Sequence, residues 1–325
     1  MKIEIPLKSK WPITSAALVS DTHNLQLNMR ELIRHTGWRM DDQPSPAGKA
    51  LEYLENGTSS LFIIEDSSTY SAYEALRTLA SHPVGRLTPV LTLVHDTSIT
   101  DIPVFEKVLH TAIARKPLTP NTFVPAFKGC LEQWESPLFT TLRKCGYAIL
   151  NNQIDSATET LKKLLDIPAA IPYACPALIK IYVERNDWKT AESLIIDTIK
   201  AHPRMPSLLL TVADFYAAAR MPSESMRFFK KLKAICNGSA LFSFDIAQSA
   251  LAMGHLDVAI DALSEWNKAR PGNDMVVQNL AKLYISEGHE QSLEKLLHMN
   301  KSTIRRLSEQ WDRAESGHLN HNVAS

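Results

Sequence analysis

The residues of this chain that could carry chemistry are three acids and a lysine that follow short apolar runs. They are Asp21, Glu65, Asp66 and Lys116. The first half has no Gly-rich phosphate loop, no Gly-x-Ser-x-Gly segment and no histidine paired with a nucleophile. Chemistry in this half would therefore rest on carboxylates and one primary amine.

Cysteine and histidine do not add a metal site to this set. The cysteines lie far apart with no Cys-x-x-Cys pair, which is typical of reduced, buried thiols. His318 and His321 have no further ligand nearby in the sequence. We therefore expect no resident metal. The four cysteines are Cys130, Cys145, Cys175 and Cys236.

The first 136 residues alternate between two patterns. Continuous apolar runs predict strands at 16–19, 61–64 and 90–94. Amphipathic periodicity predicts helices at 25–33, 47–54, 70–80 and 121–134, and Gly37 suits the end of the first of these helices. The stretch 104–114 is mixed in pattern. This alternation predicts a parallel sheet with helices on both faces, and functional groups beyond the carboxyl ends of its strands.

Residues 13–134 resemble a bacterial response-regulator receiver domain. The resemblance rests on the order of elements, on acids that close the first and third strands, and on Lys116-Pro117 before the last helix. It implies a flavodoxin-like (βα)5 fold. In that family a strand-end aspartate accepts a phosphoryl group, and an acidic pair helps it to hold Mg²⁺. A hydroxyl residue and the lysine bind the phosphoryl oxygens.

The sequence departs from this family at several positions. Glu65 stands at the phosphoacceptor position, and Ser20 replaces the first acid of the pair, which leaves Asp21 alone. Val94 stands at the hydroxyl position. Because phosphoryl transfer depends on accurate positioning, these changes predict a pseudo-receiver that is not phosphorylated.

The sequence fits two interpretations of Glu65. Its charge near Lys116 could imitate a phosphorylated state, or the two residues could form an ion pair in a docking or dimerising scaffold. A shift of one residue would instead make Asp66 the acceptor. The alternative is then a phosphorylation-switched regulator that uses Asp66 or Glu65 with Asp21 and Lys116, and Mg²⁺ at Asp21 and Glu65.

The second half repeats every 34 residues, without gaps, in five windows from Leu138. Small or bulky residues recur at fixed columns of the window, and each window predicts two helices joined by a polar turn. This pattern resembles the tetratricopeptide repeat, which implies an α-solenoid over residues 138–302. The four columns are Cys145, Ile179, Ala213, Ala247, Ala281; Ala148, Tyr182, Tyr216, Ala250, Tyr284; Ala157, Ala191, Ser225, Ala259, Leu293; and Leu161, Ile195, Phe229, Leu263, Leu297.

Column residues are packing positions, so they specify the fold and leave the ligand open. The resemblance implies that the first helices of the repeats line a groove that binds a segment of a partner protein. Helical spacing maps that groove onto residues of mixed charge. They are Lys180, Glu184, Asp214, Phe244, Asp245, Gln248, Gln278 and Lys282.

The whole chain is predicted to have three parts: residues 1–136, residues 138–302, and a capping helix with a disordered tail at 303–325. The formal net charge is zero, which disfavours a nucleic-acid or membrane partner. No apolar run approaches the roughly 20 residues of a membrane-spanning helix. We expect a cytoplasmic protein.

These expectations combine into a bacterial signalling adaptor. It would bind protein partners through the repeat groove and need no cofactor. It would have no enzymatic activity, and residues 116–134 could form a homodimer contact. A second alternative to this adaptor is an α/β enzyme domain carried on a repeat scaffold.

Overall fold

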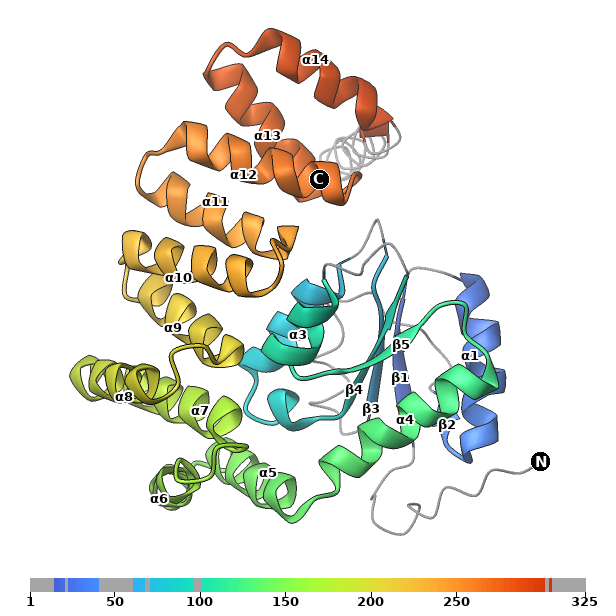
Figure 1. Ribbon diagram of the computed structural model, residues 1–325, viewed down its shortest axis with the longest axis vertical. Coiled ribbons are helices and arrows are strands. Elements are labelled where there is room, and N and C mark those ends of the chain that lie inside the picture. Colours follow the sequence, from blue (N-terminus) through green and yellow to red (C-terminus); the bar gives the residue numbers. More distant parts are fainter. Residues whose placement is uncertain are drawn as a thin grey trace, which may run out of the picture. The chain divides into compact units, whose positions relative to one another are not determined.

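The computed structural model describes residues 15–20, 23–40, 61–67, 71–95, 101–301 and 304–305 (Figure 1). By its internal contacts the chain divides into two compact units, residues 1–239 and 240–325. The first unit holds the sheet and the first helical hairpins. The second holds the remaining hairpins. The predicted helix at 47–54 and nearly all of the predicted terminal part, 303–325, lie outside the described residues.

The sheet of the first unit has five parallel strands in the order β2-β1-β3-β4-β5. Every residue of β1, β3 and β4 is buried, because helices cover both faces of the sheet, and this explains their continuous apolar runs. The predicted parallel sheet is therefore confirmed. The strands are β1 (Ser15–Val19), β2 (Arg39–Met40), β3 (Leu61–Glu65), β4 (Val90–Val94) and β5 (Ala112–Arg115).

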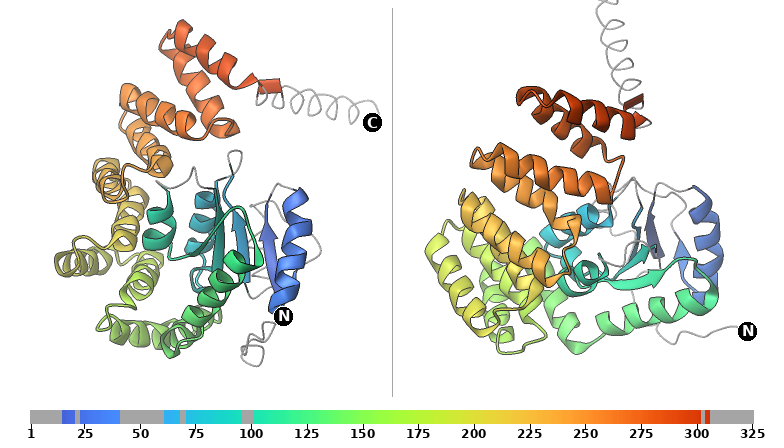
Figure 2. Two further views of the ribbon diagram at one scale, coloured as in Figure 1. Left: turned by 45° about the vertical axis from the view of Figure 1, so that its right-hand side comes forward. Right: turned by 45° about the horizontal axis from the view of Figure 1, so that its top comes forward.

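Helices α1 and α4 cover one face of the sheet, and α3 lies on the other (Figures 1 and 2). Helix α1 ends before Gly37, whose φ of 76° is the left-handed conformation expected at a helix end. The stretch of mixed pattern forms a π-helix and then β5. These elements are α1 (His23–Thr36), α3 (Ala72–Ser81), η3 (Gly85–Leu87), η5 (Val104–Val108) and α4 (Pro120–Trp134).

Helical hairpins follow α4, one in each predicted window. The first unit contains three of them. They are α5 (Pro137–Leu150) with α6 (Ile154–Leu164), α7 (Ile171–Glu184) with α8 (Trp188–Ala201), and α9 (Pro206–Ala218) with α10 (Pro222–Ile235). The second unit contains two more. They are α11 (Ser243–Ala252), which follows η6 (Ala240–Phe242), with α12 (Leu256–Ala269), and α13 (Asp274–Ser286) with α14 (Glu290–Met299).

The turn inside each hairpin has the same backbone conformation. One residue per turn adopts a left-handed φ, between 57° and 74°, and these residues recur every 34 positions. They are Asn152, Asn186, Arg220, Gly254 and Gly288. The 34-residue period predicted from the side-chain columns therefore also appears in the backbone conformation. Described residues 137–301 are therefore a helical repeat region with the repeat length of tetratricopeptide proteins.

The packing columns are buried in the middle windows. Ala191, Ala213 and Ala259 are fully buried, and small residues there let paired helices approach closely. The fifth window differs. The column pattern places Leu297 in the core, but Leu297 is 42% exposed, whereas Leu296 is buried. Helix α14 thus presents the preceding residue to the core, a rotation of about 100° relative to the pattern.

Among the described helices, none has the length and the apolar character that crossing a membrane requires. All four cysteines are free and buried, as predicted. Burial raises the pKa of the Cys130 thiol to about 12 and that of Cys175 to about 11. These thiols are therefore protonated and unreactive at neutral pH.

Candidate functional site

A charged cluster lies at the carboxyl end of the sheet. Glu65, the last residue of β3, is 3% exposed. One oxygen of its carboxylate accepts a hydrogen bond from the Ser20 hydroxyl, and the other accepts one from the Lys116 ammonium, with which it forms an ion pair. A buried carboxylate is costly unless it is paired and hydrogen-bonded, and these two donors meet that need.

Lys116 reaches Glu65 from the segment that follows β5. Its backbone N–H donates to the Val94 carbonyl oxygen at 2.9 Å, and the Lys116–Pro117 peptide bond is cis. Its Nζ lies 3.1 Å from Nε2 of His95, at the end of β4. Sequence reasoning missed His95, although its place directly after a buried strand was a usable signal.

Asp66 and Thr92 are buried near this cluster but make other contacts. The Asp66 carboxylate, 1% exposed, accepts from the backbone N–H of Ala72 at 3.0 Å, at the start of α3. The Thr92 hydroxyl donates to Oγ1 of Thr111 at 3.0 Å. Val94, at the expected hydroxyl position, is buried and apolar. Asp21 lies outside the described residues.

The cluster therefore brings together one carboxylate, one ammonium, one hydroxyl and one imidazole. Within the described ranges, no three or more His, Cys, Asp or Glu side chains are grouped so that they could hold a metal ion. The Glu65 carboxylate is the ion-pair partner of the Lys116 ammonium. The cluster is thus a buried ion pair whose carboxylate also accepts a hydrogen bond from Ser20.

Two residues of the predicted partner groove contact the α/β half of the same chain. Lys180 Nζ on α7 donates to the carbonyl oxygen of Ser81, at the end of α3, at 2.7 Å. Asp214 on α9 forms an ion pair with Arg77 of α3, with 2.5 Å between Oδ1 and Nη2. A third groove residue, Glu184, lies 3.9 Å from Lys180 Nζ. The first-helix face of these hairpins is thus directed toward α3.

An aromatic cluster reinforces this contact. Trp134 of α4 lies 4.3 Å from Phe139 of α5, and Phe139 lies 4.9 Å from Tyr173 of α7, measured between ring centroids. His110, between η5 and β5, lies 5.2 Å from Tyr173. The expected boundary near residue 137 is therefore a change of element type within one continuous core.

Gly146 on α5 marks a close approach between the two halves of this unit. A Cβ atom at Gly146 would lie 2.9 Å from the backbone oxygen of Pro83 and 3.3 Å from Cδ1 of Leu87. Only glycine therefore allows α5 to lie this close to the segment around η3. No sequence signal marks this contact, because a single helical glycine fits many roles.

The remaining predicted groove residues lie in the second unit. Gln248 on α11 and Lys282 on α13 are exposed. Asp245 and Gln278, on the same two helices, are partly buried. Phe244 lies 6.3 Å from the Trp266 ring of α12.

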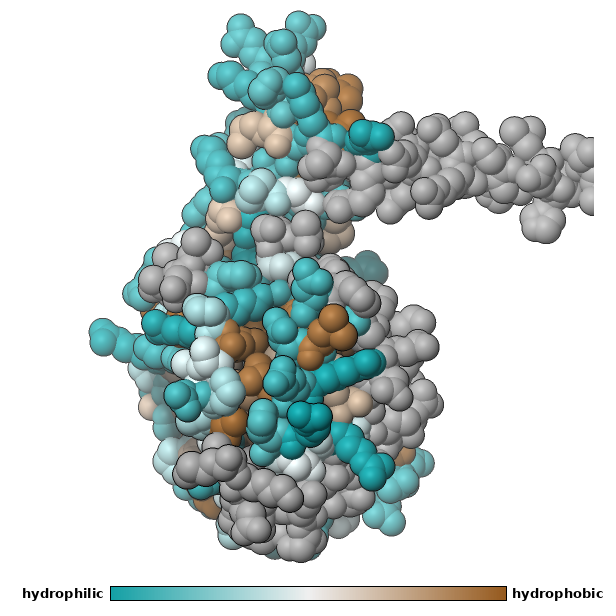
Figure 3. Space-filling model, turned by 90° about the vertical axis from the view of Figure 1, so that its right-hand side faces the viewer, coloured by the Kyte–Doolittle hydropathy of each residue, from teal (hydrophilic) through white to brown (hydrophobic). Residues whose placement is uncertain are grey.

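Exposed apolar side chains also occur in this unit. Figure 3 shows one face of the whole molecule, on which hydrophilic residues predominate over the described surface and hydrophobic ones gather in a few small groups. On α11, α13 and α14, five large apolar side chains are more than a third exposed. They are Leu251, Met275, Ile285, Leu297 and Met299.

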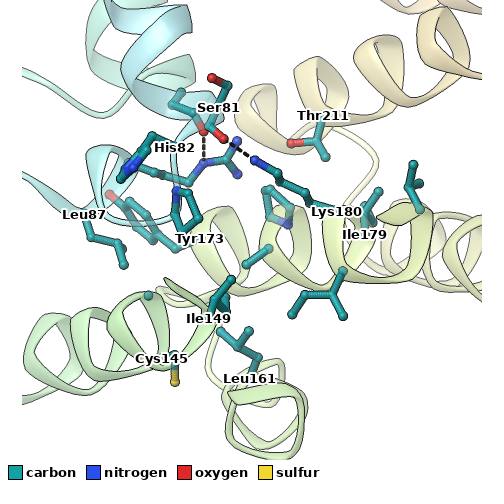
Figure 4. Close-up of a pocket in the computed structure, with 18 of the residues that line it drawn as sticks. Ser81, His82, Leu87, Cys145, Ile149, Leu161, Tyr173, Ile179, Lys180 and Thr211 are labelled. Atoms are coloured by element: carbon teal, nitrogen blue, oxygen red, sulfur yellow. Dashed lines mark hydrogen bonds between the residues drawn. The ribbon is translucent and has the colours of Figure 1, made fainter. Parts of the chain in front are cut away.

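A cavity of about 390 Å³ lies in the first unit between α3, η3 and helices α5, α6, α7 and α9 (Figure 4). In the close-up, Ile149, Leu87 and Tyr173 surround the hollow, and Lys180 reaches across to Ser81. A second hollow of about 380 Å³ shares Arg86 and Asp214 with it. Sequence reasoning missed this site, because no motif links α3 to α7.

Two basic groups beside these hollows have shifted pKa values. Burial lowers the pKa of Arg86 to about 10, so it stays charged at neutral pH. Burial, and then the charge of Arg86, lower the pKa of His110 to about 4, so its imidazole is neutral at pH 7.

Comparisons with known proteins add three solved structures. A crystal structure of MamA aligns at 14% identity over 51% of this chain and 96% of that chain, with a TM-score of 0.41. Another MamA crystal structure aligns at 13% identity over 53% and 94%, with a TM-score of 0.43. TTC0263, a thermophilic TPR protein in Thermus thermophilus, aligns at 16% identity over 55% and 98%, with a TM-score of 0.35.

No protein-family model matches the chain, and no curated protein does.

The close approach at Gly146 predicts opposite effects for two glycine substitutions. Gly146→Ala should lower the free energy of unfolding by about 1–3 kcal/mol, because its methyl group overlaps the Pro83 oxygen. Gly129→Ala on α4 is the matched control, because nothing lies within 4 Å of its Cβ position. That change should stabilise the chain by up to about 1 kcal/mol. Urea denaturation measures both, and equal effects would refute the assignment.

The buried imidazole of His110 predicts that stability depends on pH. Its folded-state pKa of about 4 lies below the unfolded value of 6.5. As pH falls from about 6.5 to 4, the unfolded chain binds a proton that the folded chain resists. The free energy of unfolding should therefore drop by up to about 3 kcal/mol. In His110→Asn, which tolerates the φ of 53°, this loss should disappear from denaturation curves. An unchanged pH dependence in the variant would contradict it.

Proposed function

We propose that this protein is a bacterial signalling adaptor that holds partner proteins through its helical repeats. Its α/β half is a receiver-type domain of flavodoxin-like fold that has lost phosphoryl transfer. That half serves as a structural end piece on the first three hairpins. The last two hairpins then provide the partner-binding face.

The observation that carries the proposal is the Glu65–Lys116 pair. The lysine that would bind phosphoryl oxygens already has a buried carboxylate as its partner, and Ser20 adds a hydrogen bond to the same carboxylate. The strand order β2-β1-β3-β4-β5 supports a receiver-type fold, because flavodoxin-like sheets have this order. A permanent carboxylate at the phosphoacceptor position favours a domain with one fixed state over a domain that phosphorylation switches between two states.

The phosphorylation-switched alternative is less well supported. Asp66 would have to act as the acceptor, yet its carboxylate is buried and accepts a hydrogen bond from the Ala72 backbone. Reaching a phosphodonor would break that contact at the start of α3. The dimer contact over residues 116–134 stays a prediction.

The division of the repeats supports the second part of the proposal. Lys180 and Asp214 contact the chain's own α/β half, so the equivalent face of the first hairpins is engaged within the chain. Gln248 in the second unit is exposed, and so is Lys282 in the same unit's next hairpin. An extended or helical segment of a partner protein is the ligand that a face of mixed charge fits.

Treatment with acetyl phosphate and Mg²⁺ tests the loss of phosphoryl transfer. We expect no acid-labile phosphate on the wild-type chain, measured by intact-protein mass spectrometry. Glu65→Asp should also stay unlabelled, because Ser20 still stands at the first acid position. Labelling of the wild type that disappears in Asp66→Asn would establish the alternative.

Partner capture tests the assignment of the binding face. Full-length wild-type chain and variants serve as baits in a lysate of the native cell, and captured proteins are quantified by mass spectrometry. Lys282→Glu and Gln248→Ala should each lose a protein that the wild type holds, while their melting temperatures stay unchanged.

The matched control for this experiment is Lys268→Glu, an exposed position on the second helix α12. It should retain the partner, with a dissociation constant on the order of micromolar. Equal loss in all three variants would contradict a specific face. A partner that none of them loses would place binding elsewhere.

A further inference from the structure

The cavity between the α/β half and the hairpins has an apolar body and a cationic end. Leu142, Ile149 and Phe215 are among the side chains that line its body. Arg86 and Lys180 border it at the α3 side. Its volume of about 390 Å³ lies within the range of roughly 300–1,000 Å³ for small-molecule sites.

Arg86 is the cation at this end whose hydrogen-bonding capacity is least used. Its Nε donates to the carbonyl oxygen of Ala80 at 2.9 Å. Across the described residues, its side chain makes no further hydrogen bond and no ion pair. A half-buried guanidinium has five N–H donors to satisfy, and the terminal amino groups are the pair best shaped for a planar anion.

The surrounding charges leave a net positive balance. The charge of Asp214 raises the pKa of Arg86. The Asp214 carboxylate forms an ion pair with Arg77. Glu184 lies 3.9 Å from Lys180. Two cations and two acids line this cavity itself. Arg77 lines the adjoining hollow, so across the two hollows together three cations face two acids. His110 adds no charge at neutral pH because burial lowers its pKa to about 4.

We propose that this cavity binds a small amphipathic carboxylate. Its hydrocarbon body lies among Leu142, Ile149 and Phe215, and its carboxylate accepts hydrogen bonds from the terminal amino groups of Arg86. A carboxylate fits better than an alcohol or an amine, because a planar guanidinium binds it through two parallel hydrogen bonds.

Such a ligand would contact both halves of the first unit at once. Leu87 and Arg86 come from the α/β half, whereas Ile149 and Phe215 come from the hairpins. Since the ligand binds only where these surfaces meet, it stabilises the folded unit by mass action. This inference adds a small-molecule ligand to the protein scaffold and does not depend on the partner.

Isothermal titration of the full-length chain with three ten-carbon probes tests the proposal. Decanoate should bind at least about ten times more tightly than decanol, because hydrogen bonds to a charged group contribute roughly that factor. Decylamine should bind more weakly than decanol. Failure of decanoate to bind, or binding no tighter than that of decanol, would overturn the proposal.

Two variants separate the head group from the apolar body. Arg86→Gln should weaken decanoate at least about tenfold and leave decanol unchanged. Arg185→Gln, an exposed arginine at the end of α7 that pairs with Asp155, is the matched control and should bind decanoate like the wild type.

Ala177→Phe places a ring inside the cavity lining and should abolish binding of both probes while the chain stays folded by circular dichroism. Undiminished decanoate binding in either Arg86→Gln or Ala177→Phe would overturn the site.

Discussion

The first unit depends on the contact between helix α3 with its following segment and the first helices of three hairpins. This contact combines an ion pair, Arg77 with Asp214, an aromatic cluster around Tyr173, and the close approach at Gly146. The aromatic cluster supplies apolar burial, which is the larger stabilising contribution, whereas a partly exposed ion pair contributes up to about 1 kcal/mol. The polar contacts therefore set the orientation of a packing that apolar burial stabilises.

This dependence explains why a repeat array can carry an α/β domain. A single helical hairpin cannot bury its apolar face, so solenoids rely on neighbouring repeats and on end caps. Here the α/β half covers one face of α5, α7 and α9, and its own α3 face is covered in return. The Glu65–Lys116 ion pair also joins two elements, because it links the end of β3 to the segment that follows β5.

Much of the fold could be predicted from the sequence because it depends on local periodicity. The buried strands β1, β3 and β4 have continuous apolar runs, and the hairpins have a 34-residue period that the turn residues Asn186 and Arg220 repeat in the backbone. Short β2 lacks such a run, so no pattern indicates it. The exposure of Leu297 was also unpredictable, since a rotation of α14 by one residue leaves the column pattern intact.

The sequence could predict a candidate site only where its residues lie at the ends of predicted strands. Glu65 and Lys116 meet because parallel strands bring their carboxyl ends to one edge. Arg86 and Ile149 meet because the segment after α3 packs on a hairpin much later in the chain, and no local pattern encodes such a distant contact. The cavity therefore lies between two elements that only tertiary packing brings together. A ligand bound there would contact both elements, so its binding and the stability of the first unit are thermodynamically linked.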